Sequence, residues 1–158
     1  MPRLPGQVDE AKTDAILKAA GALFADRGLA ASMDEIARRA GVSKQTLYNR
    51  FASKSEIAQA LAEQRSAAVT APLTGGGEPE AVLEALALSL LERVCAPQKT
   101  ASLRGVCLVS AEAPEISRIV YQAGPGESLK QLSAWLADQT RAGRLDIPDP
   151  DEAAEMFT

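Results

Sequence analysis

Apolar residues recur at helical spacing over most of the chain, and no strand pattern persists. The longer helical segments are predicted at about residues 9–27, 53–71, 80–96, 101–112, 114–123 and 126–142, with a further helix starting at Asp151. A stretch rich in proline and glycine at residues 72–79 interrupts this pattern and is interpreted as a loop. The sequence therefore predicts an all-α fold without internal repeats.

Two shorter helices are predicted between Ser32 and Phe51, joined by a turn at Gly41. Ser32 is a good N-cap residue for the first of them, and Glu35 three positions later completes a capping box. Gly41 supplies the positive φ that ends a helix without strain, and Ser43 caps the second helix. Such a helix-turn-helix pattern is typical of proteins that bind the major groove of DNA.

The second short helix has an apolar face, anchored by Leu47 and Phe51, and an outward polar face without acidic residues. Lysine, glutamine and asparagine side chains read base edges, and hydroxyl groups donate to phosphate oxygens. The candidate DNA contacts, including both cap serines and a lysine that begins the next helix, are Ser32, Ser43, Lys44, Gln45, Thr46, Tyr48, Asn49 and Lys54. Two ordinary bundle helices with solvated faces are the alternative, but turn, anchors and polar face together favour DNA binding.

The run from Ile36 to Phe51, followed by Ser-Lys-Ser-Glu at residues 53–56, resembles the DNA-binding domain of TetR-type repressors. The preceding helix, with its apolar positions and Gly28, also fits, so the resemblance covers about residues 9–62. It implies a homodimer that binds a palindromic operator in double-stranded DNA. It also implies a helical C-terminal domain that binds a small-molecule effector and changes the spacing of the two recognition helices.

The resemblance also divides the roles of the candidate DNA contacts. The positions that match the family's phosphate contacts are Thr46, Tyr48 and Lys54. The positions at which base recognition varies between members are Lys44, Gln45 and Asn49. Arg50 departs from the pattern, which more usually has an aromatic residue or histidine before the phenylalanine. A solvated charge at Arg50 is favoured slightly over an added phosphate contact.

Three segments are predicted: a flexible N-terminal arm at residues 1–8, a helix-turn-helix DNA-binding domain at 9–55, and a helical effector-binding and dimerisation domain at 56–158. A disordered arm is favoured over a minor-groove contact by Arg3. TetR-type proteins usually pair two long C-terminal helices in the dimer, whereas this chain stops shortly after the helix that begins at Asp151. The C-terminal domain is therefore expected to be truncated.

In this family the effector cavity lies among the helices that follow the linker. The corresponding candidates here are Leu86, Leu90, Val94, Leu103, Val106, Cys107, Val120, Tyr121, Trp135 and Gln139. For any single one of them, a plain core position is the favoured alternative. Tyr121 and Trp135 combine a large apolar surface with one hydrogen-bonding group. The effector is predicted to be a small, largely apolar molecule.

The net charge of −4 is unevenly distributed. Residues 1–65 carry ten lysines and arginines against eight acids, and residues 66–158 carry seven against thirteen. Screening over about 8–10 Å at physiological salt separates the fields of two such faces. The acidic total is therefore compatible with a DNA partner.

Catalytic chemistry is poorly supported by the composition. The chain has no histidine, which removes the commonest general base and metal ligand, and no cysteine–histidine cluster. No enzyme activity, metal site or cofactor is predicted. Cys95 and Cys107 are interpreted as small buried hydrophobic residues in preference to a redox pair. The sequence has neither a signal-peptide pattern nor an apolar run of bilayer length, so a cytoplasmic protein without a membrane partner is expected.

The leading hypothesis is a ligand-responsive DNA-binding regulator, more specifically a repressor. A helical protein-interaction module that keeps the helix-turn-helix shape without reading DNA is the alternative. The sequence does not distinguish repression from activation, because that depends on where the operator lies.

Overall fold

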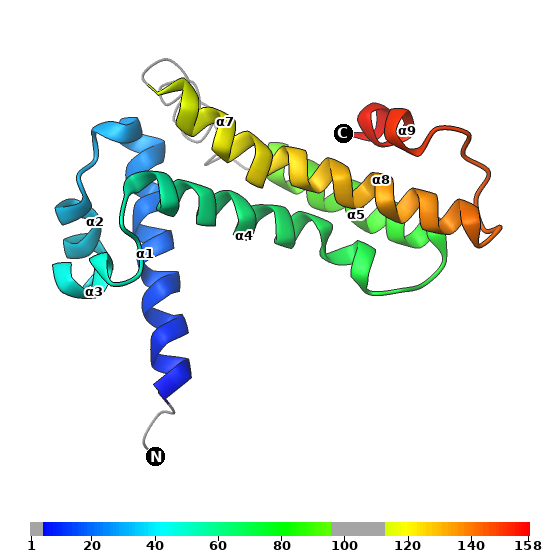
Figure 1. Ribbon diagram of the computed structural model, residues 1–158. Coiled ribbons are helices and arrows are strands. Elements are labelled where there is room, and N and C mark those ends of the chain that lie inside the picture. The colour runs from blue at the N-terminus through cyan, green and yellow to red at the C-terminus, as the bar shows by residue number, and fades with distance from the viewer. Residues whose placement is uncertain (1–4, 96–112) are drawn as a thin grey trace. The chain divides into compact units, whose positions relative to one another are not determined.

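The computed structural model describes residues 5–95 and 113–158, which form helices, turns and loops with no strand among them (Figure 1). The elements are α1 (Pro5–Arg27), the 3₁₀ turn η1 (Gly28–Ala30), α2 (Met33–Ala40), α3 (Lys44–Tyr48), α4 (Lys54–Thr74), α5 (Pro79–Cys95), α7 (Pro114–Ala123), α8 (Pro125–Arg141) and α9 (Pro150–Phe157). The all-α prediction is confirmed. The helix predicted at residues 101–112 lies outside the described residues.

Two boundaries of the long helices differ from the sequence prediction by more than one residue. α1 begins at Pro5 rather than Asp9, so residues 5–8 continue the helix instead of forming an arm. Proline suits a first helical turn, where its missing N–H has no intrahelical partner in any case. α4 continues through Pro72 to Thr74. Its last turn is closed by hydrogen bonds to the carbonyls of Ala71 and Pro72, so the proline does not end the helix.

The described residues divide into two compact units. The first unit comprises residues 5–61 and 113–120, and the second comprises residues 62–95 and 121–158. The division falls later than the expected boundary after residue 55, because the first turns of α4 bury Ile57 and Leu61 in the core of the first unit.

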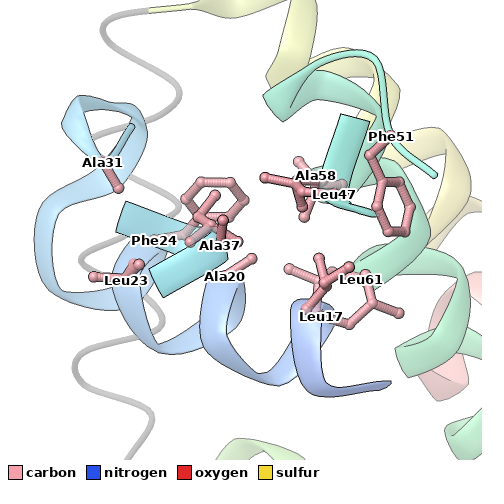
Figure 2. Packing of buried hydrophobic residues seen from close by; sticks show 13 residues of the cluster. Leu17, Ala20, Leu23, Phe24, Ala31, Ala37, Leu47, Phe51, Ala58 and Leu61 are labelled. Atoms are coloured by element: carbon pink, nitrogen blue, oxygen red, sulfur yellow. The ribbon is translucent and has the colours of Figure 1, made fainter. Parts of the chain in front are cut away.

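The core of the first unit holds the short helices in place. α2 has 8 residues and α3 has 5, lengths at which an isolated helix is unstable in water. Figure 2 shows Leu47 and Phe51 among side chains contributed by α1, α2 and α4. The largest side chains that are fully buried in this core are Ile16, Ile36, Leu47 and Ile57. Tertiary packing therefore fixes the position of α3.

A separate core lies in the second unit. Its buried residues are Val69, Leu86, Leu132, Leu136 and Ala154, from α4, α5, α8 and α9. Leu86 and Leu132 are almost completely buried, at 2% and 1% exposure. Each unit thus buries its own apolar surface.

Candidate nucleic-acid interface

The start of α2 carries the capping box that the sequence predicts. The backbone N–H of Glu35 donates to Ser32 Oγ over 3.2 Å, and the Ser32 N–H donates to Glu35 Oε2 over 2.8 Å. These two hydrogen bonds satisfy N–H groups that the helix itself leaves without partners. The donation by the Ser32 backbone, followed by that of its hydroxyl, lowers the pKa of Glu35 below its ordinary value. Arg27 adds an ion pair to Glu35 over 3.0 Å.

The turn between α2 and α3 depends on one glycine. Gly41 has φ +68°, and its N–H donates to the Arg38 carbonyl over 3.3 Å. A Cβ at this position would meet no atom within 4 Å, so the backbone conformation rather than space favours glycine. Ser43 then caps α3 by accepting the Thr46 N–H over 3.0 Å. Ser32 and Ser43 therefore cap the N-termini of α2 and α3, as predicted.

The polar face of α3 lies open to solvent. Leu47 is fully buried and Phe51 is 8% exposed, although Phe51 follows the helix instead of belonging to it. The predicted outward residues that are exposed are Lys44, Gln45, Tyr48 and Asn49. Thr46 is half-buried, and its hydroxyl lies 2.8 Å from that of Ser43.

Two side-chain pairs order this face. Gln45 Nε2 donates to Asn49 Oδ1 over 2.7 Å, which orients two candidate base-reading amides one turn apart. The Lys44 ammonium forms an ion pair with the Asp34 carboxylate on α2, and both side chains are exposed. An exposed ion pair contributes little net stability, so exchange of Asp34 for a DNA group costs little.

Two cations near α3 make internal contacts that the sequence did not predict. The Lys54 ammonium donates to the backbone carbonyl of Leu29, which joins the start of α4 to η1. Arg50 Nη1 donates to Thr13 Oγ1 over 2.6 Å, and this bond is partly buried. The expectation that Arg50 is a plain solvated charge is therefore wrong, because α1 passes beside the end of α3 and supplies a hydroxyl acceptor. Lys54 and Arg50 each link elements far apart in sequence.

Shallow hollows flank α3 on its α1 side. One is lined by Lys12, Thr46, Asn49 and Arg50. Another is lined by Ala11, Lys12, Ala15, Ala40, Gly41, Val42, Ser43 and Thr46. Lys12 belongs to both, although sequence reasoning did not select it. No local motif marks this residue, since only the packing of α1 against the helix-turn-helix brings it there.

The structure does not gather the candidate effector contacts into one set. Leu86 is buried in the second unit, with Leu90 and Trp135 partly buried beside that core. Gln139 is also buried, and its Oε1 has no hydrogen-bond partner among the described residues. The remaining described candidates are Val120 and Tyr121. They do not lie with the other expected effector contacts.

Val120 packs against the first core instead, and Tyr121 is 60% exposed. Consecutive helical residues project about 100° apart, which separates these two side chains. Leu103, Val106, Cys107 and the side chain of Val94 lie outside what the structure describes. Cys95 ends α5 as an exposed free thiol, so its predicted burial is wrong.

The described residues contain neither a candidate membrane-spanning helix nor a candidate metal-binding cluster. None of the helices there is both long and apolar enough to cross a membrane. Nor does that part of the chain bring together three or more histidine, cysteine or acidic side chains that could hold a metal ion.

Comparison with known proteins identifies the two parts of the sequence. Residues 16–61 match the family model described as bacterial regulatory proteins of the tetR family. Residues 81–158 match that of the C-terminal domain of AefR-like transcriptional repressors. The two matched ranges together cover more than half of the chain.

Individual relatives agree with this assignment. The transcriptional activator FasR of Mycolicibacterium smegmatis is 54% identical over 50 residues, which are 31% of this chain and 23% of FasR. The chain thus matches less than a quarter of that relative's length. The solved structure of the flavonoid-responsive regulator FrrA is 31% identical, with a TM-score of 0.65 over 91% of this chain and 76% of FrrA.

A TetR transcription regulatory protein from Mycobacterium vanbaalenii is 27% identical, with a TM-score of 0.62 over 97% of this chain and 91% of that protein. These similarities extend through the helix-turn-helix and the helices that follow it. The chain therefore belongs to the TetR family of bacterial regulatory proteins.

Proposed function

We propose that this protein is a ligand-responsive repressor that binds a palindromic operator as a homodimer and is released by a small, largely apolar effector. The observation that carries the DNA-binding part is the exposed polar face of α3 on a helix fixed by buried Leu47 and Phe51. A rigidly held polar helix presents its side chains to base edges without an ordering cost at the moment of binding.

Base recognition is assigned to the exposed residues of α3. Gln45 and Asn49 are one helical turn apart and are already oriented by their mutual hydrogen bond. Amide side chains recognise adenine in the major groove, and Lys44 suits guanine. The proposed phosphate contacts are Ser32, Ser43, Thr46, Tyr48 and Lys54. Phosphate contacts fix the register of the protein on the duplex without reading its sequence.

The effector is assigned to the second unit, in the cytoplasm where the operator lies. FrrA, which is 31% identical to this chain, is described as flavonoid-responsive. A flavonoid is a small, largely apolar molecule with a few polar groups. The partly buried Trp135 and the buried Gln139 of α8 offer an aromatic surface and an amide oxygen to a ligand of that class. Repression is proposed because the C-terminal match is described as a domain of transcriptional repressors.

Selection from a random duplex library with the full chain tests the proposal. A recovered palindrome with half-sites about one helical turn apart is expected for a dimer of such helices. Recovery of single half-sites would contradict the dimer while supporting DNA recognition. No enrichment at all would contradict sequence-specific binding and favour the protein-interaction module.

Point variants then assign the roles on the recovered site. Gln45→Ala and Asn49→Ala are expected to change the preferred bases, each good contact being worth about 1–3 kcal/mol of discrimination. Tyr48→Ala is expected to weaken binding to all duplexes alike. A change of base preference in Tyr48→Ala would reverse this division of roles. A reporter fused to the recovered operator distinguishes repression from activation, which matters because FasR is named an activator.

A further inference from the structure

The N-terminal half of α1 borders the surface assigned to DNA. Figure 1 shows α2 and α3 on the same side of α1 within the first unit. Lys12 on α1 lines a hollow with Thr46 and Asn49, which belong to the recognition segment. It also lines the neighbouring hollow with Ser43, the N-cap of α3. A residue 31 positions before that cap therefore shares its surface.

Lys12 differs from three other cations of this surface in whether its charged group already has a bonding partner. Lys44 is paired with Asp34, Lys54 donates to a backbone carbonyl, and Arg50 donates to Thr13. Lys12 is exposed, and in the described part of the chain its ammonium forms no ion pair or hydrogen bond. Nothing in that part of the structure must be broken for this ammonium to bind an anion.

The packing of α1 fixes where Lys12 lies. Thr13, the next residue, accepts the partly buried hydrogen bond from Arg50 at the end of α3. Ile16, one turn further, is fully buried in the core that also holds Leu47. The exposed acids Glu10 and Asp14, two positions to either side, each project about 160° away from Lys12 around the helix. These contacts fix the position of Lys12 relative to α3, while its exposed four-carbon side chain can reach outward.

We propose that Lys12 is a phosphate-contacting residue, which extends the DNA interface from the helix-turn-helix onto α1. The inference rests on the proposed DNA binding by α3. When Gln45 and Asn49 face the base edges, the strand that borders the groove passes the side of α3 that carries Ser43 and Thr46. The Lys12 ammonium lies on that side and neutralises one phosphate there. Such a contact adds affinity without adding sequence preference.

A pair of matched variants tests this contact. Lys12→Gln removes the charge at the hollow, and Lys18→Gln removes an equal charge on the same helix. Lys18 is exposed and lines neither hollow, because it projects about 240° away from Lys12. The measurement is the affinity of the full chain for the recovered operator and for an unrelated duplex, each over a series of salt concentrations. Urea unfolding of both variants checks that the fold is kept.

In Lys12→Gln the slope of log affinity against log salt is expected to become shallower by about 0.9 for one lost phosphate contact. The loss of affinity should then be about threefold larger at 50 mM than at 200 mM salt, for both duplexes. Lys18→Gln should keep the wild-type slope, and Lys12→Arg should restore it.

Equal slopes for Lys12→Gln and wild type would overturn the inference. So would an equal change in Lys18→Gln, since the charge would then act only through the general field of the unit. These results leave the proposed function intact, because the wild type still binds. A wild-type chain without operator binding would overturn the proposed function and the Lys12 contact with it.

Discussion

Single cations in the first unit serve the fold as well as the surface. Lys54 illustrates this, because its ammonium donates to the Leu29 carbonyl while the same residue is a proposed phosphate contact. The local sequence motif indicates Lys54 as a candidate DNA contact. It could not identify Leu29 as the partner, because 25 residues separate the two and only the folded chain brings them together. Arg50 and Thr13, which are 37 residues apart, show the same limit.

Lys54→Ala is accordingly expected to lower both DNA affinity and stability. A hydrogen bond from a charged donor in a partly buried place contributes about 1–2 kcal/mol to the free energy of unfolding. Urea unfolding of the full chain measures this loss. Lys18→Ala, on an exposed position of α1, should stay within about 0.5 kcal/mol of wild type. Reduced affinity with unchanged stability would show that Lys54 acts on DNA alone.

At the scale of elements, the short helices were the most predictable part of the molecule. Ser32, Gly41 and Ser43 each have a local chemical reason for their positions, so the boundaries of α2 and the start of α3 followed from sequence. The long helices were less predictable at their ends. α4 continues past Pro72, because a proline in the final turn still permits the last hydrogen bonds to close around it.

The capping box of α2 predicts a specific pH dependence. Hydrogen bonds from Ser32 lower the pKa of Glu35 in the folded state, so its ionised form stabilises the fold. That contribution is fully present above the ordinary glutamate pKa of about 4.3 and is lost as the pH falls through the lower folded-state pKa. Glu35→Gln keeps the size of the side chain and one oxygen acceptor, replaces the other oxygen with an amide nitrogen, and does not titrate.

The measurement for this variant is urea unfolding of Glu35→Gln and wild type from pH 7 down to pH 3. The variant should be less stable than wild type at pH 7, and the difference should shrink on acidification below about pH 4.3. A difference that stays constant over this range would show that the carboxylate charge does not contribute through the cap. Arg27 also contributes to the charge effect, since its guanidinium pairs with the same carboxylate.

For the molecule as a whole, helical periodicity predicts that residues are buried but not which core buries them. The sequence predicts one group for Val120, Tyr121, Leu86 and Trp135, because all four follow the loop at residues 72–79. The structure instead places Val120 with the first core and leaves Tyr121 exposed. The uneven charge was readable from the sequence, since acids exceed basic residues only after residue 65. The division of the apolar residues between the two cores can be seen only in the folded chain.

The buried amide of Gln139 provides the last prediction, which joins stability to effector response. Gln139 is 7% exposed, and its Oε1 has no partner among the described residues, an arrangement that costs stability unless a ligand donates to it. Gln139→Met keeps the length of the side chain and removes this acceptor. The free energy of unfolding should therefore stay unchanged or rise by up to about 1 kcal/mol. On the proposed function, added flavone stabilises the wild type, and Gln139→Met is expected to lose that stabilisation. Gln131→Met, on the same helix, removes an amide already bonded to Glu127 over 3.0 Å and should keep the flavone response. Thermal unfolding with and without flavone measures both effects. A destabilised Gln139→Met that keeps the response would show that this amide serves the fold and not the effector.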